Sequence, residues 1–189
     1  MDIRTIITLN HINAQFYETI AHDFDETRGK AWAGWEMLMN HIPTPTAPFR
    51  VLDIGCGNGR FGLFLHEKWG SNLIYHGIDN NPALLELAKE ALSAKSISFE
   101  LDRADIVTWD KKFAPEYDLV VAFGVIHHIP SSQYRNYSLW NWANAVKTGG
   151  YLVFACWRFY EFDRFRERIT AWGDDLKDKI EPHDYLLDW

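Results

Sequence analysis

The 189-residue sequence predicts a doubly wound α/β fold, in which helices cover both faces of a parallel sheet. Three observations predict this fold class. Short apolar runs alternate with segments of helical periodicity, the first run leads into a loop with three glycines, and the second run ends in an aspartate. Right-handed crossovers between parallel strands then place helices on both faces. We expect residues 1–48 to form an N-terminal helical cap with a linker, and residues 49–189 to form the core domain.

The N-terminal cap is expected to contain two helices. Apolar residues recur at every fourth position from Ile12 to Phe24, which is the spacing of one helix face and predicts a helix there. A second helix is predicted over residues 31–41. Three prolines between positions 42 and 48 then interrupt regular structure, so this segment marks the boundary to the core.

The core is predicted to contain five strands joined by helices. Pro82 begins one helix at a position where its missing N–H does no harm, and Gly149 with Gly150 is expected to end a later helix. Only one helix is predicted after the fifth strand, so we expect a shortened or fragmentary core whose last strands are missing. The predicted strands span residues 50–54, 72–78, 96–101, 117–125 and 151–157, and the predicted helices span residues 60–68, 82–91, 133–146 and 160–172.

Composition narrows the class of protein and its compartment. The formal net charge is −7, which argues against a large electropositive surface for nucleic acid. The two cysteines, Cys56 and Cys156, are too few for a disulfide framework and favour a reducing compartment. No stretch approaches the roughly 18 apolar residues of a membrane span, and residues 1–10 do not resemble a signal peptide. We therefore expect a cytoplasmic protein.

An apolar strand runs directly into a glycine-rich loop in the sequence VLDIGCGNG at positions 51–59. Gly55, Gly57 and Gly59 allow a tight turn and a close approach of the backbone to a ligand, at the edge of the sheet where such folds bind ligands. Their alternate spacing differs from the G-x-G-x-x-G of dinucleotide sites. Asp53 would repel a pyrophosphate but not a ligand with ammonium and sulfonium groups, which favours S-adenosylmethionine (SAM) over NAD.

Two further aspartates follow the next two predicted strands. Asp79 comes about twenty residues after the glycine loop, where a carboxylate can accept hydrogen bonds from both hydroxyls of a ribose. The alternative for Asp79 is a cap of the helix that begins at Pro82. Ala104 and Asp105 follow the third predicted strand, and Asp105 is expected either to accept a hydrogen bond from an adenine amine or to be a solvated turn residue.

These features resemble the motifs of the class I SAM-dependent methyltransferases. The resemblance is carried by D-x-G-x-G-x-G at 53–59, by Asp79, by Ala104 and Asp105, and by the apolar strand at 117–125. It implies a Rossmann-like methyltransferase core with SAM as the cofactor. The residues expected to bind the cofactor are Tyr17, Asp53, Gly55, Cys56, Gly57, Gly59, Asp79, Ala104, Asp105 and Phe123.

A narrower resemblance lies toward the two ends of the sequence. The pattern FYxxIAxxFxxTR that ends at Arg28, followed by Trp32, looks like the N-terminal signature of the tRNA wobble-uridine carboxymethyl methyltransferases and their bacterial relatives. The sequence VIHH at 125–128 and the segment at 181–189 are also similar to that group. This resemblance implies that Tyr17 closes over the methionine end of SAM and that Arg28 pairs with a carboxylate.

His127, His128 and Arg28 are the candidate catalytic residues. Both histidines follow the fourth predicted strand and suit acid–base work or orientation of an acceptor, unless one packs in the core and the other is solvated. No metal site is expected, because no third ligand has a clear spacing. We expect SAM-dependent methylation of a carboxylate on tRNA or on a small molecule, with a protein partner subunit left open. The alternative is a non-catalytic SAM-binding module, or a truncated paralogue, that supports a partner.

Overall fold

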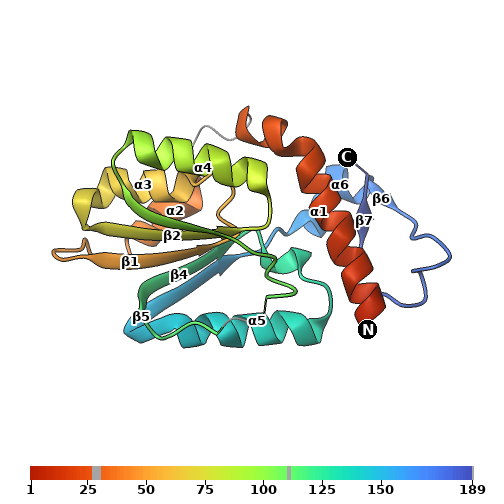
Figure 1. Ribbon diagram of the computed structural model, residues 1–189. Helices are drawn as coiled ribbons and strands as arrows, with labels where there is room; N and C mark the ends of the chain where they lie inside the picture. Colours follow the sequence, from red (N-terminus) through yellow and green to blue (C-terminus); the bar gives the residue numbers. More distant parts are fainter. Residues whose placement is uncertain (27–30, 110–111, 189) are drawn as a thin grey trace.

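The computed structural model describes residues 1–26, 31–109 and 112–188. Its central element is a five-stranded sheet in which every strand is parallel to its neighbours. The strands are β1 (Phe49–Ile54), β2 (Leu73–Asp79), β3 (Ser98–Arg103), β4 (Tyr117–Phe123) and β5 (Val146–Ala155). Their order across the sheet is β3-β2-β1-β4-β5, and helices lie on both faces (Figure 1). The predicted doubly wound fold is therefore confirmed.

The helices bury apolar residues against both faces of the sheet. They are α1 (Ile3–Glu26), α2 (Ala33–Met39), α3 (Arg60–Trp69), α4 (Pro82–Ala94), α5 (Ser132–Ala145) and α6 (Asp163–Arg166), with 3-10 turns η1 (Gly70–Asn72), η2 (Ile126–His128) and η3 (Phe159–Glu161). Alternate residues of a strand point to opposite faces, so Val51 packs with Trp35 on the side of α2, α3 and α4, and Leu52 packs with Trp142 of α5 on the other side. In the described part of the chain, no helix is long and apolar enough to cross a membrane.

Helix α1 crosses the carboxyl ends of the strands instead of covering a face of the sheet (Figure 1). It begins at Ile3, earlier than the predicted helix, because Asp2 caps its first turn. The Asp2 carboxylate accepts hydrogen bonds from the backbone N–H of Arg4 at 2.9 Å and of Thr5 at 3.0 Å. Ile6 is buried in the hydrophobic cluster under α5 and anchors this end of the helix.

The segment after β5 does not form the single helix predicted over residues 160–172, so this prediction is wrong. It forms the short elements η3 and α6, and then β6 (Ile169–Thr170) pairs antiparallel with β7 (Leu186–Leu187). Pairing with a segment so far along the chain leaves no trace in local periodicity, which explains the error. Among the described residues, no strand joins the main sheet beyond β5.

The boundary between α5 and β5 also differs from the prediction. Helix α5 ends at Ala145 and β5 begins at the next residue, so Gly149 and Gly150 lie within the strand and do not end the helix. The register between β4 and β5 shifts between Tyr117 and Leu119, which absorbs the extra residues as a bulge does. Gly149 has a φ of 82° at this irregularity, a value that favours glycine.

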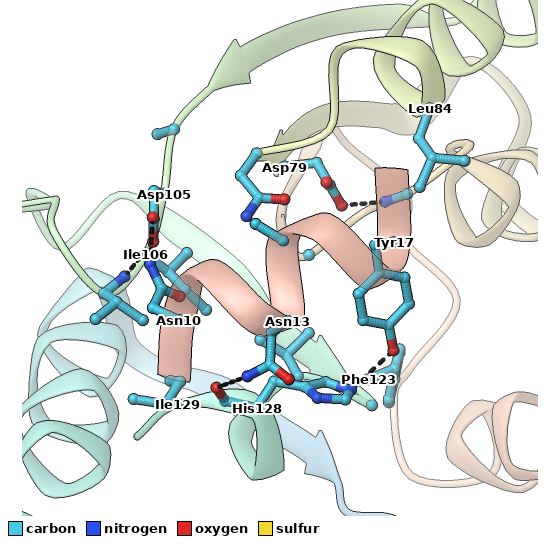
Figure 2. A pocket seen from close by; sticks show the side chains of 18 of the residues that line it. Asn10, Asn13, Tyr17, Asp79, Leu84, Asp105, Ile106, Phe123, His128 and Ile129 are labelled. Atoms are coloured by element: carbon cyan, nitrogen blue, oxygen red, sulfur yellow. Dashed lines mark hydrogen bonds between the residues drawn. The ribbon is translucent and has the colours of Figure 1, made fainter. Parts of the chain in front are cut away.

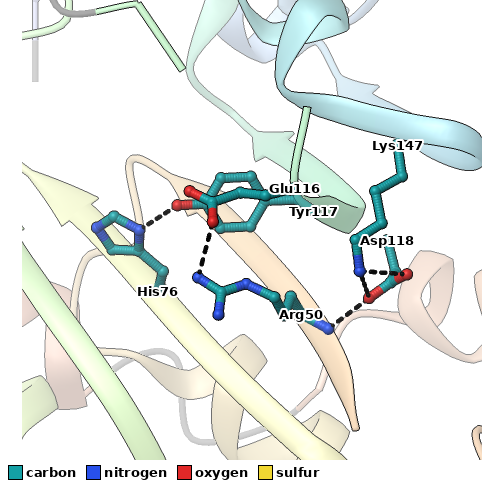
Figure 3. Close-up of polar contacts among 6 residues, drawn as sticks. All are labelled: Arg50, His76, Glu116, Tyr117, Asp118 and Lys147. Carbon is teal, nitrogen blue, oxygen red and sulfur yellow. Dashed lines mark hydrogen bonds and ion pairs between the residues drawn. The ribbon is translucent and has the colours of Figure 1, made fainter. Parts of the chain in front are cut away.

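Charged side chains tie together the amino-terminal ends of three strands (Figure 3). Asp118 on β4 accepts a hydrogen bond from the backbone N–H of Arg50 on β1 at 2.8 Å, and another from Nζ of Lys147 on β5 at 3.0 Å. The Arg50 guanidinium also forms an ion pair with Glu116 at 3.3 Å. Asp118 thus joins both neighbouring strands at the end of the sheet opposite the glycine loop.

Replacing Asp118 with alanine is expected to lower the free energy of unfolding by about 1–3 kcal/mol, because the Arg50 N–H loses its acceptor. Lys147→Ala removes only a partly exposed ion pair and is expected to cost about 1 kcal/mol or less. Urea denaturation at pH 7 measures both values. Asp118→Asn keeps an acceptor oxygen and should recover most of the loss. A cost for Asp118→Ala no larger than that for Lys147→Ala would contradict the role of the backbone contact.

Candidate functional site

A pocket lies between α1 and the carboxyl ends of β1, β2, β3 and β4 (Figure 2). The side chains of α1 form one wall, and the loops that follow the four strands form the other. Besides the residues predicted from the sequence, the lining includes Asn10 and Asn13 of α1 and Trp32. The predicted residues that line the pocket are Tyr17, Gly55, Gly57, Asp79, Ala104, Asp105, Phe123 and His128.

The glycine loop folds back onto the end of β2. The N–H groups of Gly55 and Cys56 both donate to the Ile78 carbonyl, at 2.8 and 3.0 Å. Gly55 has a φ of 70°, and Gly59, which precedes α3, has a φ of 74°; side chains rarely tolerate this left-handed backbone. A Cβ at Gly55 would also lie 2.3 Å from Cγ2 of Val125. The turn therefore depends on glycine, and it holds the loop at the floor of the pocket.

Asp79 links the glycine loop to helix α4. Its carboxylate accepts hydrogen bonds from the N–H of Gly57 at 2.8 Å and of Asn81 at 2.9 Å. Asn81 in turn caps α4 by accepting hydrogen bonds from its first N–H groups. Burial raises the pKa of Asp79, and the hydrogen bonds from backbone N–H groups oppose this effect. A carboxylate acceptor in this position suits the two hydroxyls of a ribose.

Asp105 occupies the corresponding position after β3. Its Oδ1 accepts a hydrogen bond from the Val107 N–H at 2.9 Å, and its Oδ2 accepts one from Nδ2 of Asn10 at 2.6 Å. The Ala104 N–H donates to the backbone carbonyl of Asp79 at 2.9 Å. These contacts fix two carboxylates at the ends of neighbouring strands, where each can accept hydrogen bonds from a ligand.

Hydrogen bonds also hold helix α1 over the pocket. Nδ2 of Asn13 donates to the backbone carbonyl of His128 at 2.9 Å, and the Tyr17 hydroxyl lies 2.8 Å from Nε2 of the same histidine. On the other side, Nδ2 of Asn81 donates to the carbonyl of Tyr17 at 3.1 Å. Sequence reasoning missed Asn10 and Asn13, because asparagines on a helix face belong to no motif or apolar period.

The two histidines after β4 differ in position. His128 lines the pocket, whereas His127 lies outside the lining and its Nδ1 accepts a hydrogen bond from the Trp157 N–H at 3.5 Å. Burial lowers the pKa of His127 to about 4. Burial, together with the neighbouring His127, lowers the pKa of His128 to about 3. Both imidazoles are therefore neutral near pH 7 and are weak bases.

Three more of the predicted residues lie outside the pocket lining, and one lies outside the described residues. Asp53 is buried beneath the glycine loop and accepts a hydrogen bond from the Tyr75 hydroxyl at 2.5 Å. Burial raises its pKa to about 7, although the Tyr75 hydrogen bond lowers it. Because this carboxyl group faces the core, its position does not support the argument that it repels a pyrophosphate. Cys56 is buried, Gly59 precedes α3, and Arg28 belongs to the segment that the structure does not describe.

A second group of titratable residues lies on β2 and β3, away from the pocket lining. Nδ1 of His76 lies 2.6 Å from the Tyr117 hydroxyl, and its Nε2 lies 3.3 Å from Asp102. Ligand atoms of His76, Glu100 and Asp102 lie within 4.8 Å of one another. Burial raises the pKa of Tyr117 to about 12, so its hydroxyl stays protonated. The group forms a hydrogen-bonded link between β2, β3 and β4.

Comparisons with known proteins identify the family of this chain. A profile of the methyltransferase domain family matches residues 51–150. A trans-aconitate 2-methyltransferase from Streptomyces avermitilis is 32% identical over 155 residues, which cover 78% of this chain and 55% of the relative. A tRNA (carboxymethyluridine(34)-5-O)-methyltransferase from Arabidopsis thaliana is 23% identical over 161 residues, with 82% and 34% covered.

A solved structure shows the same fold. Phosphoethanolamine N-methyltransferase 1 of Haemonchus contortus, in complex with phosphoethanolamine and S-adenosylhomocysteine, matches with a TM-score of 0.62 and 15% identity. The match covers 79% of this chain and 32% of that chain. The chain therefore has the fold of the class I SAM-dependent methyltransferases.

The chain belongs to the methyltransferase domain family, and SAM is the cofactor that its sequence predicts. It spans between a third and about half of the length of the curated relatives named above. The residues present fit this cofactor. Carboxylate acceptors stand at the ends of β2 and β3, and a loop without bulky side chains follows β1, so a ribose, an adenine and an amino-acid chain each have a suitable surface.

Asp79→Ala is expected to weaken SAM binding by about 1.5–3 kcal/mol, the range for hydrogen bonds to a charged group. The loss has two sources, because the same carboxylate also holds the Gly57 N–H. Isothermal titration calorimetry measures the affinity. As a control, Asp102→Ala removes a carboxylate from the neighbouring strand, outside the pocket lining, and should leave the affinity for SAM unchanged. Unaltered affinity in Asp79→Ala would contradict the assignment of this residue to the cofactor.

The pKa of Asp53, raised to about 7 from 3.8, predicts a pH dependence of stability. Between about pH 4 and pH 7 the native state keeps this proton while the unfolded state loses it, so stability falls as the pH rises. Asp53→Asn removes the titration and still accepts from Tyr75. The unfolding free energy of the variant minus that of the native protein should therefore increase by up to about 4 kcal/mol between pH 4 and pH 8. Urea denaturation at several pH values measures this difference, and a difference that does not change with pH would contradict the prediction.

Proposed function

We propose that this pocket holds SAM and that the protein transfers the cofactor's methyl group to a carboxylate oxygen. When bound, SAM supplies an electrophilic methyl group on a positively charged sulfur. In the proposed arrangement, Asp79 accepts hydrogen bonds from the ribose hydroxyls and Asp105 accepts one from the adenine amine. The loop with Gly55 and Gly57 leaves space for the methionine part, which Tyr17 of α1 covers.

The proposed acceptor is a carboxylate because Tyr17 and His128, the polar pair at the β4 end of the pocket, provide no strong base. The Tyr17 hydroxyl lies 2.8 Å from Nε2 of His128, and the pKa of about 3 keeps this histidine neutral and weakly basic. Apart from Asp79 and Asp105, the described residues of the lining include no carboxylate or amine that could serve as a base. A carboxylate acceptor is already an anion at neutral pH, so it needs alignment and desolvation but no deprotonation.

The names of two relatives support this class of acceptor. Trans-aconitate is itself a carboxylate, and the plant tRNA enzyme is named for a carboxymethyl group on uridine. The net charge of −7 favours a small free carboxylate over tRNA, because nucleic-acid binding depends on positive charge. The N-terminal sequence pattern resembles that of the carboxymethyl methyltransferases, and on this ground Arg28 remains the residue proposed to pair with the acceptor.

The second candidate is a SAM-binding module that supports a partner and does not itself catalyse transfer. It is favoured by the weak basicity of His128, the histidine of the pocket lining, whose pKa burial lowers to about 3. A module of this kind would bind SAM with ordinary affinity and show no turnover on any acceptor.

Incubation with methyl-labelled SAM tests the proposal directly. We expect label in a set of small carboxylic acids that includes trans-aconitate, and none in total tRNA. In the Asp53→Asn variant, which lacks the carboxyl group with a pKa of about 7, the rate should stay constant between pH 6 and pH 8, because neither a carboxylate acceptor nor His128 titrates in that range. A rate that rises with pH, or label only in amine or hydroxyl acceptors, would exclude a carboxylate. SAM binding without any transfer would instead favour the module.

A further inference from the structure

The order of the strands determines which part of the cofactor lies at which end of the pocket. In the proposed function, on which this inference rests, adenine lies at the end of β3 and ribose at the end of β2. The sheet continues from β2 to β1 and β4, so the sulfonium, which follows the ribose in SAM, lies at the ends of β1 and β4. The described lining residues at that end include no acidic side chain. The side chains at that end are those of Tyr17, Trp32, Phe123, Val125 and His128.

Trp32, from the segment between α1 and α2, provides an aromatic wall at this end. Its Cη2 would lie 3.6 Å from a Cβ built on Gly124, the residue that follows β4. Its ring centroid lies 6.2 Å from that of Phe123. Behind it, Trp35 stacks at 5.7 Å with an angle of 25° between the rings. Trp35 is only 3% exposed, so the core fixes the position of Trp32.

One cation packs against this pair of indoles. The Arg60 guanidinium lies 5.4 Å from the centroid of Trp32 and 5.0 Å from that of Trp35. Arg60 also lowers the pKa of the Asp53 carboxyl group in part, although burial raises that pKa. Arg60 therefore stabilises the orientation of both indoles from the start of α3.

We propose that Trp32, together with Phe123, packs against the sulfonium and its methyl group and thereby favours SAM over S-adenosylhomocysteine. The face of an aromatic ring attracts a cation through its quadrupole, and indole does so most strongly. After methyl transfer the sulfur becomes a neutral thioether, and this attraction disappears. Trp32 is thus a positioning and specificity residue that holds the charged cofactor more tightly than the product.

Calorimetric titration of the full chain with each of the two compounds tests this inference. Trp32→Leu is expected to weaken SAM binding about three- to tenfold more than it weakens S-adenosylhomocysteine binding. Trp32→Phe keeps an aromatic face and should retain part of the preference. An analogue that carries a protonated amine in place of the methylsulfonium should follow SAM.

Trp140→Leu is the matched control, because this tryptophan on α5 is 56% exposed and lies outside the pocket lining. It should leave both affinities unchanged. Equal losses for the two compounds in Trp32→Leu, or no loss, would overturn the inference. If the native chain itself did not bind SAM, the proposed placement of the cofactor would fail instead. Thermal melting checks the fold, and Phe123→Leu provides the same comparison should Trp32→Leu not fold.

Discussion

The hydrogen bond from the Gly57 N–H to the Asp79 carboxylate, 2.8 Å long, joins the two loops on which the pocket is built. The loop after β1 can turn back on itself only because its glycines accept a left-handed backbone. The loop after β2 is fixed because Asp79 and Asn81 together organise the start of α4. The buried carboxylate at their junction is stabilised by backbone N–H groups. The floor of the site therefore follows from local backbone geometry.

The polarity of the pocket changes from one end to the other. At the ends of β2 and β3 the lining offers carboxylates, whose remaining lone pairs suit the hydroxyl and amine donors of a nucleoside. At the ends of β1 and β4 it offers glycines, aromatic rings and a neutral histidine. A ligand with hydrogen-bond donors at one end and a polarisable charge at the other therefore fits this pocket in only one orientation. Orientation of the cofactor is thus a property of the whole lining, with no single residue deciding it.

The site residues that could be predicted from the sequence are those that both the backbone conformation and the expected ligand contacts require. The glycine loop, Asp79 and Asp105 could be predicted because each follows an apolar strand whose carboxyl end must face the ligand edge of a parallel sheet. Asp53 was placed correctly along the chain, but alternation in β1 turns its side chain toward Tyr75 and the core. The helix predicted over residues 160–172 failed because pairing between β6 and β7 depends on a distant segment. Asn10 and Asn13 could not be found, since only the folded helix brings them to the site.

The placement of α1 has a consequence for how the protein is made. This helix is synthesised before the strands, and the side chains and carbonyls that bind it come 64 to 115 positions later in the chain. Its buried residues Ile6 and Leu9 have no surface to pack against until the strands have formed. A nascent chain therefore exposes an amphipathic helix during most of its synthesis, and such exposed apolar surface favours chaperone binding or aggregation. The wall that closes the pocket is translated before every other part of the site and can dock only after the loops that bind it have been made.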